Sequence, residues 1–271
     1  MRKTILLIPG WHEKAHDLRT ITHGRPPLPG LAARGFDPRT FELQPDESLP
    51  ERIDRFAEYI RDLKNREPER FPLALFGYSM GGIVARGLLY RHPELVPDIS
   101  HIALLATPNW GLPMADIPAL ARIVGLPWRE LYNIDPEREF VPTLNSCRGA
   151  WSELDGTRVW IPDREPWIAP PSVKLLAIAG MVPRFGDGDG LVTVDSATMG
   201  GRIPSITITD RHANHLNVTG ETDTIATIVR GFRRSDGVWP KVLDAFCDFV
   251  GGSESTPSAT AYEESLTLIA H

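Results

Sequence analysis

The stretch Leu73-Ala-Leu-Phe-Gly-Tyr-Ser-Met-Gly-Gly82 joins a short apolar run to a glycine-rich turn, and a second apolar segment, residues 83–90, follows directly. Residues 77–81 fit the pattern Gly-x-Ser-x-Gly, in which a serine occupies a sharp turn between a strand and a helix. Glycines flank such a serine because the turn brings backbone segments so close that a Cβ atom would clash. We therefore expect the Ser79 hydroxyl to stand above the end of a sheet.

Short strand-like and longer helix-like patterns alternate along most of the chain. Strands are expected at residues 4–8, 38–43, 73–76, 102–106, 173–179 and 203–209. Helices are expected at residues 28–34, 51–65, 83–90 and 222–232. Such alternation predicts an α/β fold, with a mostly parallel central sheet and helices on both faces.

Residues 110–171 interrupt this alternation, and five of the seven tryptophans of the chain fall within them. A long insertion inside a compact domain is commonly functional, so we expect a cap or lid at about 110–171. Packing of these aromatic side chains onto the core is the alternative, because aromatics are frequent in cores and binding surfaces alike. The whole α/β domain is expected to span residues 1–250, and a polar C-terminal tail to span residues 251–271.

The composition excludes several classes of protein. The 271 residues, 42% of them hydrophobic and 24% charged, are typical of a soluble globular chain. A net charge of -6 disfavours binding to nucleic acid, which requires basic surfaces. Two cysteines far apart do not suggest a disulfide-rich secreted fold, and no apolar run has the length of a signal peptide or a membrane-spanning helix. We expect a cytoplasmic protein without stable membrane insertion.

A serine hydroxyl is a weak nucleophile at neutral pH, so Ser79 needs a base, and the base needs an acid that orients it. In folds with this turn the acid comes next along the chain and the histidine last. Asp187 and Asp189 follow the fifth expected strand, whereas His212 and His215 follow the sixth. Asp189 is preferred because it directly precedes Gly-Leu-Val, and Asp187 is the alternative; His215 is preferred, with His212 its nearest rival.

The developing oxyanion of an acyl-transfer reaction is usually stabilised by two backbone N–H groups. Met80 follows the candidate nucleophile at the start of a helix, and Trp11 follows the sharp Pro-Gly turn after the first strand, so these two residues are the candidate donors. Tyr78, beside the serine, and Trp110, at the start of the expected cap, are candidates for substrate contact.

No sequence pattern points to a metal or cofactor. The cysteines and histidines lack the spacing of a zinc site, and no phosphate-binding glycine loop of the Walker type is present. Asp187 and Asp189 could bind calcium in principle, but paired acids in a turn are more often solvated. We expect no cofactor.

The chain resembles the bacterial lipase branch of the α/β-hydrolase superfamily over most of residues 4–232. The resemblance is carried by four places: Ile8-Pro-Gly-Trp11, Gly77 to Gly82, Leu105-Ala-Thr-Pro108 with Gly111, and Gly188-Asp-Gly-Leu-Val192 with Asn214-His-Leu216. It implies an α/β-hydrolase fold and a serine esterase in which Ser79, Asp189 and His215 form the catalytic triad. It also implies that the backbone N–H groups of Trp11 and Met80 line the oxyanion hole.

Two positions depart from the pattern of that family. Pro9 stands where the family has a histidine before the oxyanion glycine, and Asn217 stands where some of these lipases have a calcium-binding aspartate. The metal is therefore not carried over to this chain.

The sequence thus predicts hydrolysis of a small-molecule carboxylic ester that carries an apolar group. Two alternatives remain open: a thioesterase or acyltransferase with the same triad, and a catalytically idle scaffold that binds a ligand or partner. Epoxide hydrolase and dehalogenase chemistry is disfavoured, because those reactions need an aspartate in the place of Ser79.

Overall fold

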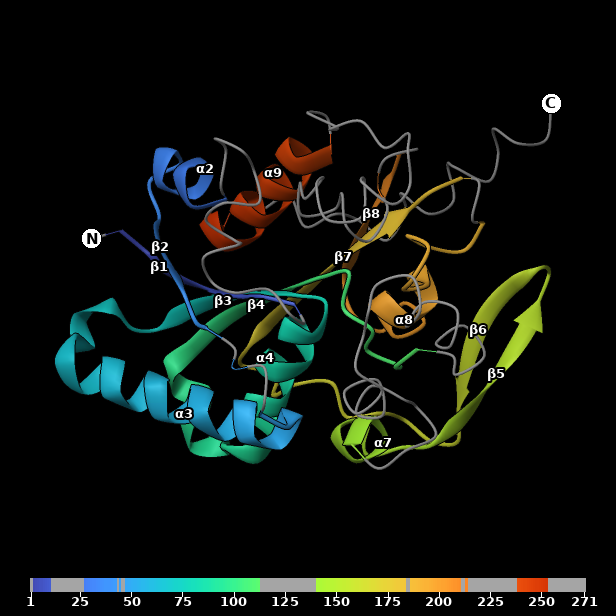
Figure 1. Ribbon diagram of the computed structural model, residues 1–271, viewed down its shortest axis with the longest axis horizontal. Coiled ribbons are helices and arrows are strands. Elements are labelled where there is room, and N and C mark those ends of the chain that lie inside the picture. Colours follow the sequence, from blue (N-terminus) through green and yellow to red (C-terminus); the bar gives the residue numbers. More distant parts are fainter. Residues whose placement is uncertain are drawn as a thin grey trace.

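The computed structural model describes residues 2–10, 27–42, 44, 47–112, 140–183, 186–210, 213 and 238–252. Within them, a six-stranded sheet has the order β2-β1-β3-β4-β7-β8, and each neighbouring pair is parallel (Figure 1). Its strands are β1 (Thr4–Ile8), β2 (Asp37–Thr40), β3 (Leu73–Tyr78), β4 (Ile99–Leu105), β7 (Lys174–Met181) and β8 (Ser205–Thr209). The parallel sheet expected from the sequence is confirmed.

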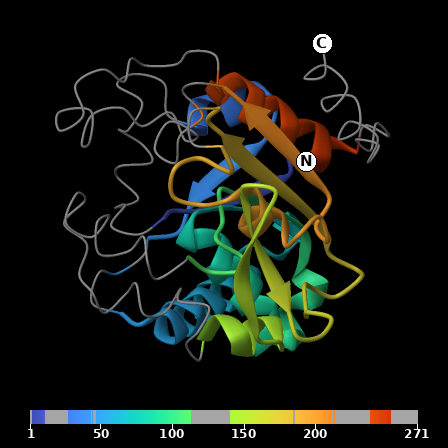
Figure 2. The same cartoon turned by 90° about the vertical axis from the view of Figure 1, so that its right-hand side faces the viewer.

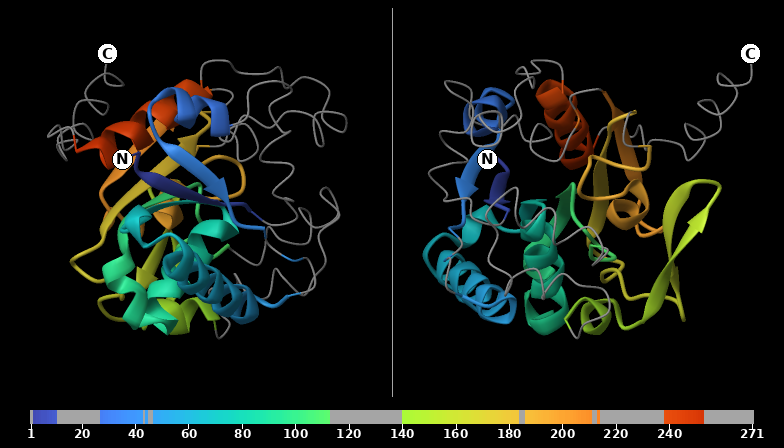
Figure 3. Two further views of the ribbon diagram at one scale, coloured as in Figure 1. Left: turned by 90° about the vertical axis from the view of Figure 1, so that its left-hand side faces the viewer. Right: turned by 45° about the vertical axis from the view of Figure 1, so that its right-hand side comes forward.

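Helices cover both faces of this sheet (Figure 3). On one face, α3 (Leu49–Arg66) and α4 (Met80–Arg91) pack on alternate residues of the central strands. On the other face lie α2 (Pro27–Ala33) and α9 (Val238–Gly251). Every residue of β1 and β3 is buried, and nearly all of them are apolar, as expected for strands covered on both faces.

The helix predicted for residues 51–65 corresponds to α3. Its buried stripe includes Ile53, Phe56, Ile60 and Leu63, at the spacing of one helix face. At its start the Glu51 carboxylate accepts a hydrogen bond from the Ser48 backbone N–H at 2.7 Å. This capping box fixes where the helix begins. By contrast, α9 was not among the expected helices, and the helix expected at 222–232 lies outside the described residues.

The described part of the insertion contains a short helix, α7 (Phe140–Asn145), and an antiparallel hairpin of β5 (Gly149–Leu154) and β6 (Thr157–Pro162). The hairpin projects beside the main sheet and faces the viewer in Figure 2. Its turn consists of Asp155 and Gly156, whose φ angles of 51° and 74° are typical of a tight hairpin turn. This hairpin is not among the elements expected from the sequence. Residues 113–139 of the expected cap lie outside the described residues.

Within the described residues, the other short helices are the 3-10 helices η1 (Pro68–Arg70) and η2 (Pro93–Asp98), and α8 (Val194–Thr198), which follows the loop after β7. None of the helices in the described ranges is both long and apolar enough to cross a membrane.

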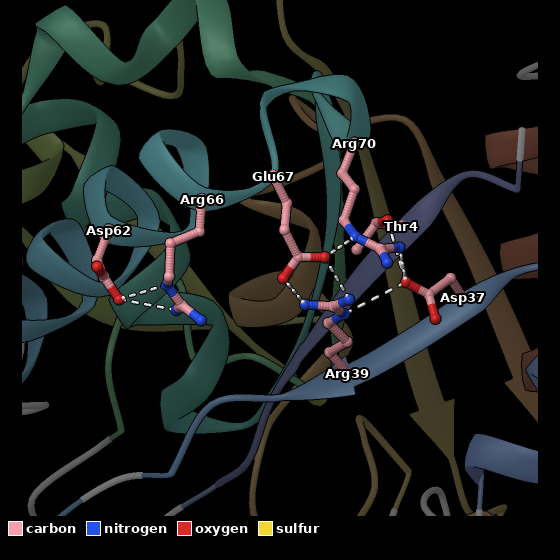
Figure 4. Close-up of polar contacts among 7 residues, drawn as sticks. All are labelled: Thr4, Asp37, Arg39, Asp62, Arg66, Glu67 and Arg70. Carbon is pink, nitrogen blue, oxygen red and sulfur yellow. Dashed lines mark hydrogen bonds and ion pairs between the residues drawn. The ribbon is translucent and has the colours of Figure 1, made fainter.

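An ion-pair network ties β2 to the turn between α3 and β3 (Figure 4). The Glu67 carboxylate accepts two hydrogen bonds of 2.9 Å from the Arg39 guanidinium and also pairs with Arg70. The hydrogen bonds from Arg39 and Arg70 lower the pKa of Glu67 to about 2. Arg70 reaches Asp37 on β2 as well, at 2.5 Å. The network lies where β2 and β3 begin, so it stabilises the edge of the sheet opposite Ser79.

Candidate functional site

Ser79 lies at the junction between β3 and α4, as the sequence predicts. Its φ of 51° and ψ of -121° are unusual for a residue with a Cβ. The Ser79 N–H donates to the Leu105 carbonyl at the end of β4 (2.8 Å), and the Gly82 N–H donates to the Ser79 carbonyl (3.1 Å). Both bonds hold the turn in this conformation, above the carboxyl end of the sheet.

The glycines around the serine are required by close backbone approach. A Cβ atom added at Gly77 would lie 2.6 Å from the Cα of Gly82. One added at Gly81 would overlap the Ile8 carbonyl oxygen and lie 2.5 Å from that of Pro9. The start of α4 is therefore packed directly on the backbone that leaves β1.

The same close packing brings the loop after β1 beside the candidate nucleophile. A Cβ added at Gly10 would lie 3.3 Å from the Ser79 Cβ and 3.0 Å from the ring of Tyr78. Trp11, the next residue, lies outside the described residues. Met80 is the first residue of α4, where backbone N–H groups have no partner within the helix. Its N–H stands at the positive end of the helix dipole.

Asp189 lies in the loop after β7, and its side chain is buried at 2% exposure. One carboxylate oxygen, Oδ1, accepts from the N–H groups of Leu191 (2.9 Å) and Val192 (2.7 Å). The Asp189 N–H in turn donates to the Val192 carbonyl at 3.1 Å. These bonds fix the orientation of the carboxylate. Asp187 is only partly buried, and its backbone carbonyl accepts from Val194 at 2.8 Å.

His212 and His215 lie outside the described residues, but the chain leading to them is described. β8 ends at Thr209, and the Asp210 N–H donates to Met181 at the end of β7 (3.1 Å). Ala213 is fully buried, and its N–H donates to the Asp210 carbonyl at 3.0 Å. Because the six strands of the main sheet are parallel, the loops that carry Gly10, Ser79, Asp189 and Ala213 emerge from the same edge of that sheet.

The two candidate substrate contacts are both buried. Tyr78 is part of the core, and its ring contacts the position of Gly10. Trp110 is 1% exposed and packs against Trp160, with ring centroids 6.3 Å apart. Its backbone N–H donates to the Ser196 hydroxyl at 3.2 Å. A packing role is thus evident for Trp110, while substrate contact by either residue stays a prediction.

Sequence reasoning missed a group of buried polar side chains beside the site. Arg86 of α4 has 0% exposure and donates to the Asn109 and Asn145 side chains at 3.1 and 3.0 Å. It also donates to the Trp167 and Ile168 carbonyls at 2.9 and 3.2 Å. Burial lowers the pKa of Arg86 to about 9. The signal in the sequence is a single arginine within the otherwise apolar segment 83–90.

The described residues offer no alternative centre of metal or thiol chemistry. Within these ranges no group of three or more histidine, cysteine or acidic side chains gathers as a metal site would require. Cys147 and Cys247 are free thiols. Burial raises the pKa of both, that of Cys247 to about 11, so both are protonated and weakly nucleophilic at neutral pH.

No protein-family model matches the chain, and no curated protein matches its sequence. Solved structures do match its fold. The mature Bacillus licheniformis lipase BlEst2 superposes with a TM-score of 0.58 at 17% identity, over 84% of this chain and 91% of that one. The metagenomic carboxyl esterase MGS0156 superposes with a TM-score of 0.64 at 15% identity, over 93% of this chain and 76% of that one. Aspergillus fumigatus lipase B superposes with a TM-score of 0.54 at 16% identity, over 91% of this chain and 56% of that one. With the parallel sheet and the helices on both faces, these likenesses show that the chain has the α/β-hydrolase fold.

Proposed function

We propose that this protein is a serine hydrolase that cleaves carboxylic esters through an acyl-serine intermediate. Ser79 is the nucleophile, His215 the general base and acid, and Asp189 the acid that orients the histidine. The observation that carries the proposal is the backbone of Ser79, whose φ of 51° holds a serine at a strand-to-helix junction. Such a conformation costs about 1–3 kcal/mol and is concentrated at active sites.

In the proposed reaction, the imidazole of His215 takes the proton of the Ser79 hydroxyl as Oγ attacks the carbonyl carbon of the ester. The tetrahedral intermediate collapses, the bond to the alcohol breaks, and the imidazolium gives its proton to the leaving oxygen. A water molecule, deprotonated by the same imidazole, then attacks the acyl-serine. This second step releases the carboxylic acid and restores the Ser79 hydroxyl.

Two backbone N–H groups, those of Met80 and Trp11, stabilise the oxyanion of each tetrahedral intermediate. The position of Met80 at the first turn of α4 and the close approach of Gly10 to Ser79 support this assignment. Donors placed in this way contribute roughly 3–4 kcal/mol each to the stability of the transition state.

The choice of Asp189 over Asp187 is supported by burial and by the two hydrogen bonds to its Oδ1. A carboxylate held in one orientation can fix the tautomer and the direction of a neighbouring imidazole. Asp187 is more exposed, and its backbone carbonyl accepts from Val194 at the base of the same turn, where an aspartate commonly serves the turn itself.

The proposed substrate is a small-molecule ester with an apolar group. The similar structures are described as a lipase and a carboxyl esterase, which agrees with this class. We assign the selection of the substrate to the cap at 110–171, inserted in a hydrolase domain of residues 1–250, with Tyr78 and Trp110 near the bound group. Residues 251–271 are proposed to be a polar C-terminal tail.

The test is turnover of p-nitrophenyl esters of graded acyl length by the wild type and by Ser79→Ala. The variant is expected to lose at least about 10,000-fold in kcat/KM, while its circular dichroism stays that of the wild type. Ser205→Ala, at the exposed first residue of β8, outside the cap and at the end of the sheet opposite Ser79, is the matched control and is expected to keep full activity. Full activity of Ser79→Ala, or a preference above about 100-fold for acyl-CoA thioesters, would contradict the proposal.

A further inference from the structure

A buried polar path links α4 to α8 through the loop that follows β4. Its centre is Asn109, which has 0% exposure. The Asn109 Oδ1 accepts from the Arg86 guanidinium of α4 at 3.1 Å. The Asn109 Nδ2 donates to the Ala197 carbonyl of α8 at 2.7 Å. A single side chain therefore contacts both helices.

These two helices are the ones that continue from the candidate catalytic residues. α4 begins directly after Ser79. α8 begins after Thr193, whose hydroxyl caps it by accepting from the Ser196 N–H at 3.0 Å. The turn that begins at the buried Asp189 and ends at the buried Val192 leads into it. In the sheet, β4 lies between β3 and β7, so the loop after β4 emerges between the loop of the serine and the loop of the aspartate.

The loop around Asn109 also contacts both α4 and α8 through other residues. On the side of the serine, a Cβ added at Gly82 would overlap the Thr107 side chain, so Thr107 packs directly on the start of α4. On the side of the aspartate, the Ser196 hydroxyl accepts from the Trp110 N–H (3.2 Å) and donates to the Gly111 carbonyl (2.9 Å). The loop thus acts as a spacer between α4 and α8.

The chemistry of the two bonds requires an amide at position 109. Arg86 offers only donors, so it needs an acceptor, whereas the Ala197 carbonyl needs a donor. An asparagine side chain presents both from one planar group, and at 0% exposure water cannot replace either bond. A carboxylate of the same shape would keep the acceptor but would lose the donor.

We infer that Asn109 is a positioning residue that holds α4 and α8, and with them Ser79 and Asp189, at the separation needed to act on one histidine. The inference rests on the function proposed above. It assigns a role to the Thr-Pro-Asn-Trp segment at 107–110, which the triad and the oxyanion hole do not involve.

The test compares two isosteric substitutions beside the same arginine. Asn109→Asp keeps the acceptor for Arg86 but removes the donor to Ala197. Asn145→Asp is the matched control: Asn145 is also buried and accepts from Arg86 at 3.0 Å, but its Nδ2 donates to the Asn109 carbonyl (2.8 Å) and not to α8. kcat, KM and the rate of reaction with a fluorophosphonate are measured for each, well below the midpoint of thermal unfolding.

We expect Asn109→Asp to lower kcat and the fluorophosphonate rate roughly 10-fold to 100-fold with KM nearly unchanged, and Asn145→Asp to lower them less than about 3-fold. Equal losses in both variants, or unchanged kcat in Asn109→Asp, would overturn the inference. If Asn109→Asp does not fold, Ser196→Ala detaches the same loop from α8 and is expected to show the same fall in kcat. A wild type that neither hydrolyses esters nor reacts with the fluorophosphonate would instead contradict the proposed function, and the inference with it.

Discussion

Ser79 has a positive φ because the chain must pass from β3 into α4 within one residue, on top of the backbone that leaves β1. The glycines on either side make this close packing possible. Their spacing around the serine is what made the turn predictable from the sequence. The role of Asn109 was not predictable in this way, because its two partners lie 23 residues before it and 88 residues after it.

A first prediction concerns Gly81, where an added Cβ would overlap the Ile8 carbonyl oxygen and lie 2.5 Å from the Pro9 carbonyl oxygen. Both atoms belong to the backbone and cannot rotate away, so Gly81→Ala is expected to lower the free energy of unfolding by about 3 kcal/mol. If the proposed function is correct, it should also lower the rate of ester hydrolysis, since it displaces the backbone of Ile8 and Pro9 beside the start of α4. Urea denaturation and an ester assay measure the two effects.

Gly251→Ala is the control for this substitution, because nothing lies within 4 Å of a Cβ added there. Its free energy of unfolding should stay within about 0.5 kcal/mol of the wild-type value. Equal stability and activity of the two variants would show that the packing of α4 on β1 is not as close as described.

A second prediction separates the two aspartates of the loop after β7. Asp189→Asn keeps the size of a buried side chain but removes its negative charge, so kcat/KM is expected to fall roughly 1,000-fold or more. Asp187→Asn changes a more exposed side chain and should cost less than about 10-fold. Steady-state kinetics on one ester decide the matter, and the reverse ranking would exchange the roles of the two residues.

At the scale of elements, α9 is attached to the sheet at the edge opposite Ser79. The Lys3 ammonium donates to the Val250 carbonyl (3.3 Å) and lies 3.1 Å from the Nδ1 of His101. The His101 ring packs edge-on against Phe249, with centroids 5.1 Å apart. Burial, and then the charges of Lys3 and Lys174, lower the pKa of His101 to about 4. The imidazole is therefore neutral at pH 7 and accepts from Lys3.

This lowered pKa predicts a pH dependence of stability. The unfolded chain binds a proton at His101 below its ordinary pKa of 6.5, whereas the folded chain does so only near pH 4. The contribution of the neutral, buried His101 to the free energy of unfolding is therefore fully present above pH 6.5 and is lost as the pH falls to about 4. The free energy of unfolding, measured in urea, should therefore fall more steeply in the wild type than in His101→Gln over this range. Parallel slopes would show that His101 titrates normally.

The elements differ in how far the sequence predicts them. Buried parallel strands are continuous apolar runs, so β1, β3, β4 and β7 were recognised with ends shifted by at most a few residues. The β5–β6 hairpin was not predicted, although Asp155-Gly156 is a strong turn signal, because the expectation for residues 110–171 was a cap or lid as a whole and not its separate elements. α9 was missed although its buried residues, among them Val242 and Phe246, recur at helical spacing.

At the scale of the whole molecule, the sheet order brings together loops that are far apart in the chain. β1, β3, β4, β7 and β8 are consecutive neighbours, so the loops after them follow one another along one edge. The sequence was enough to predict that Ser79 and Asp189 lie in loops that follow strands of this sheet. The buried contacts between their supporting helices could not, because hydrogen bonds such as that from Arg86 to Asn109 depend on the packing of the complete fold.

The most direct test of the account is to locate the site of covalent labelling by a fluorophosphonate, using mass spectrometry of peptides from the intact protein. The account predicts one phosphonylated residue, Ser79, and a strong decrease of its labelling in His215→Ala, whose base is absent. An enzyme that hydrolyses esters but carries the label elsewhere would contradict it. So would labelling of Ser79 at the wild-type rate in His215→Ala.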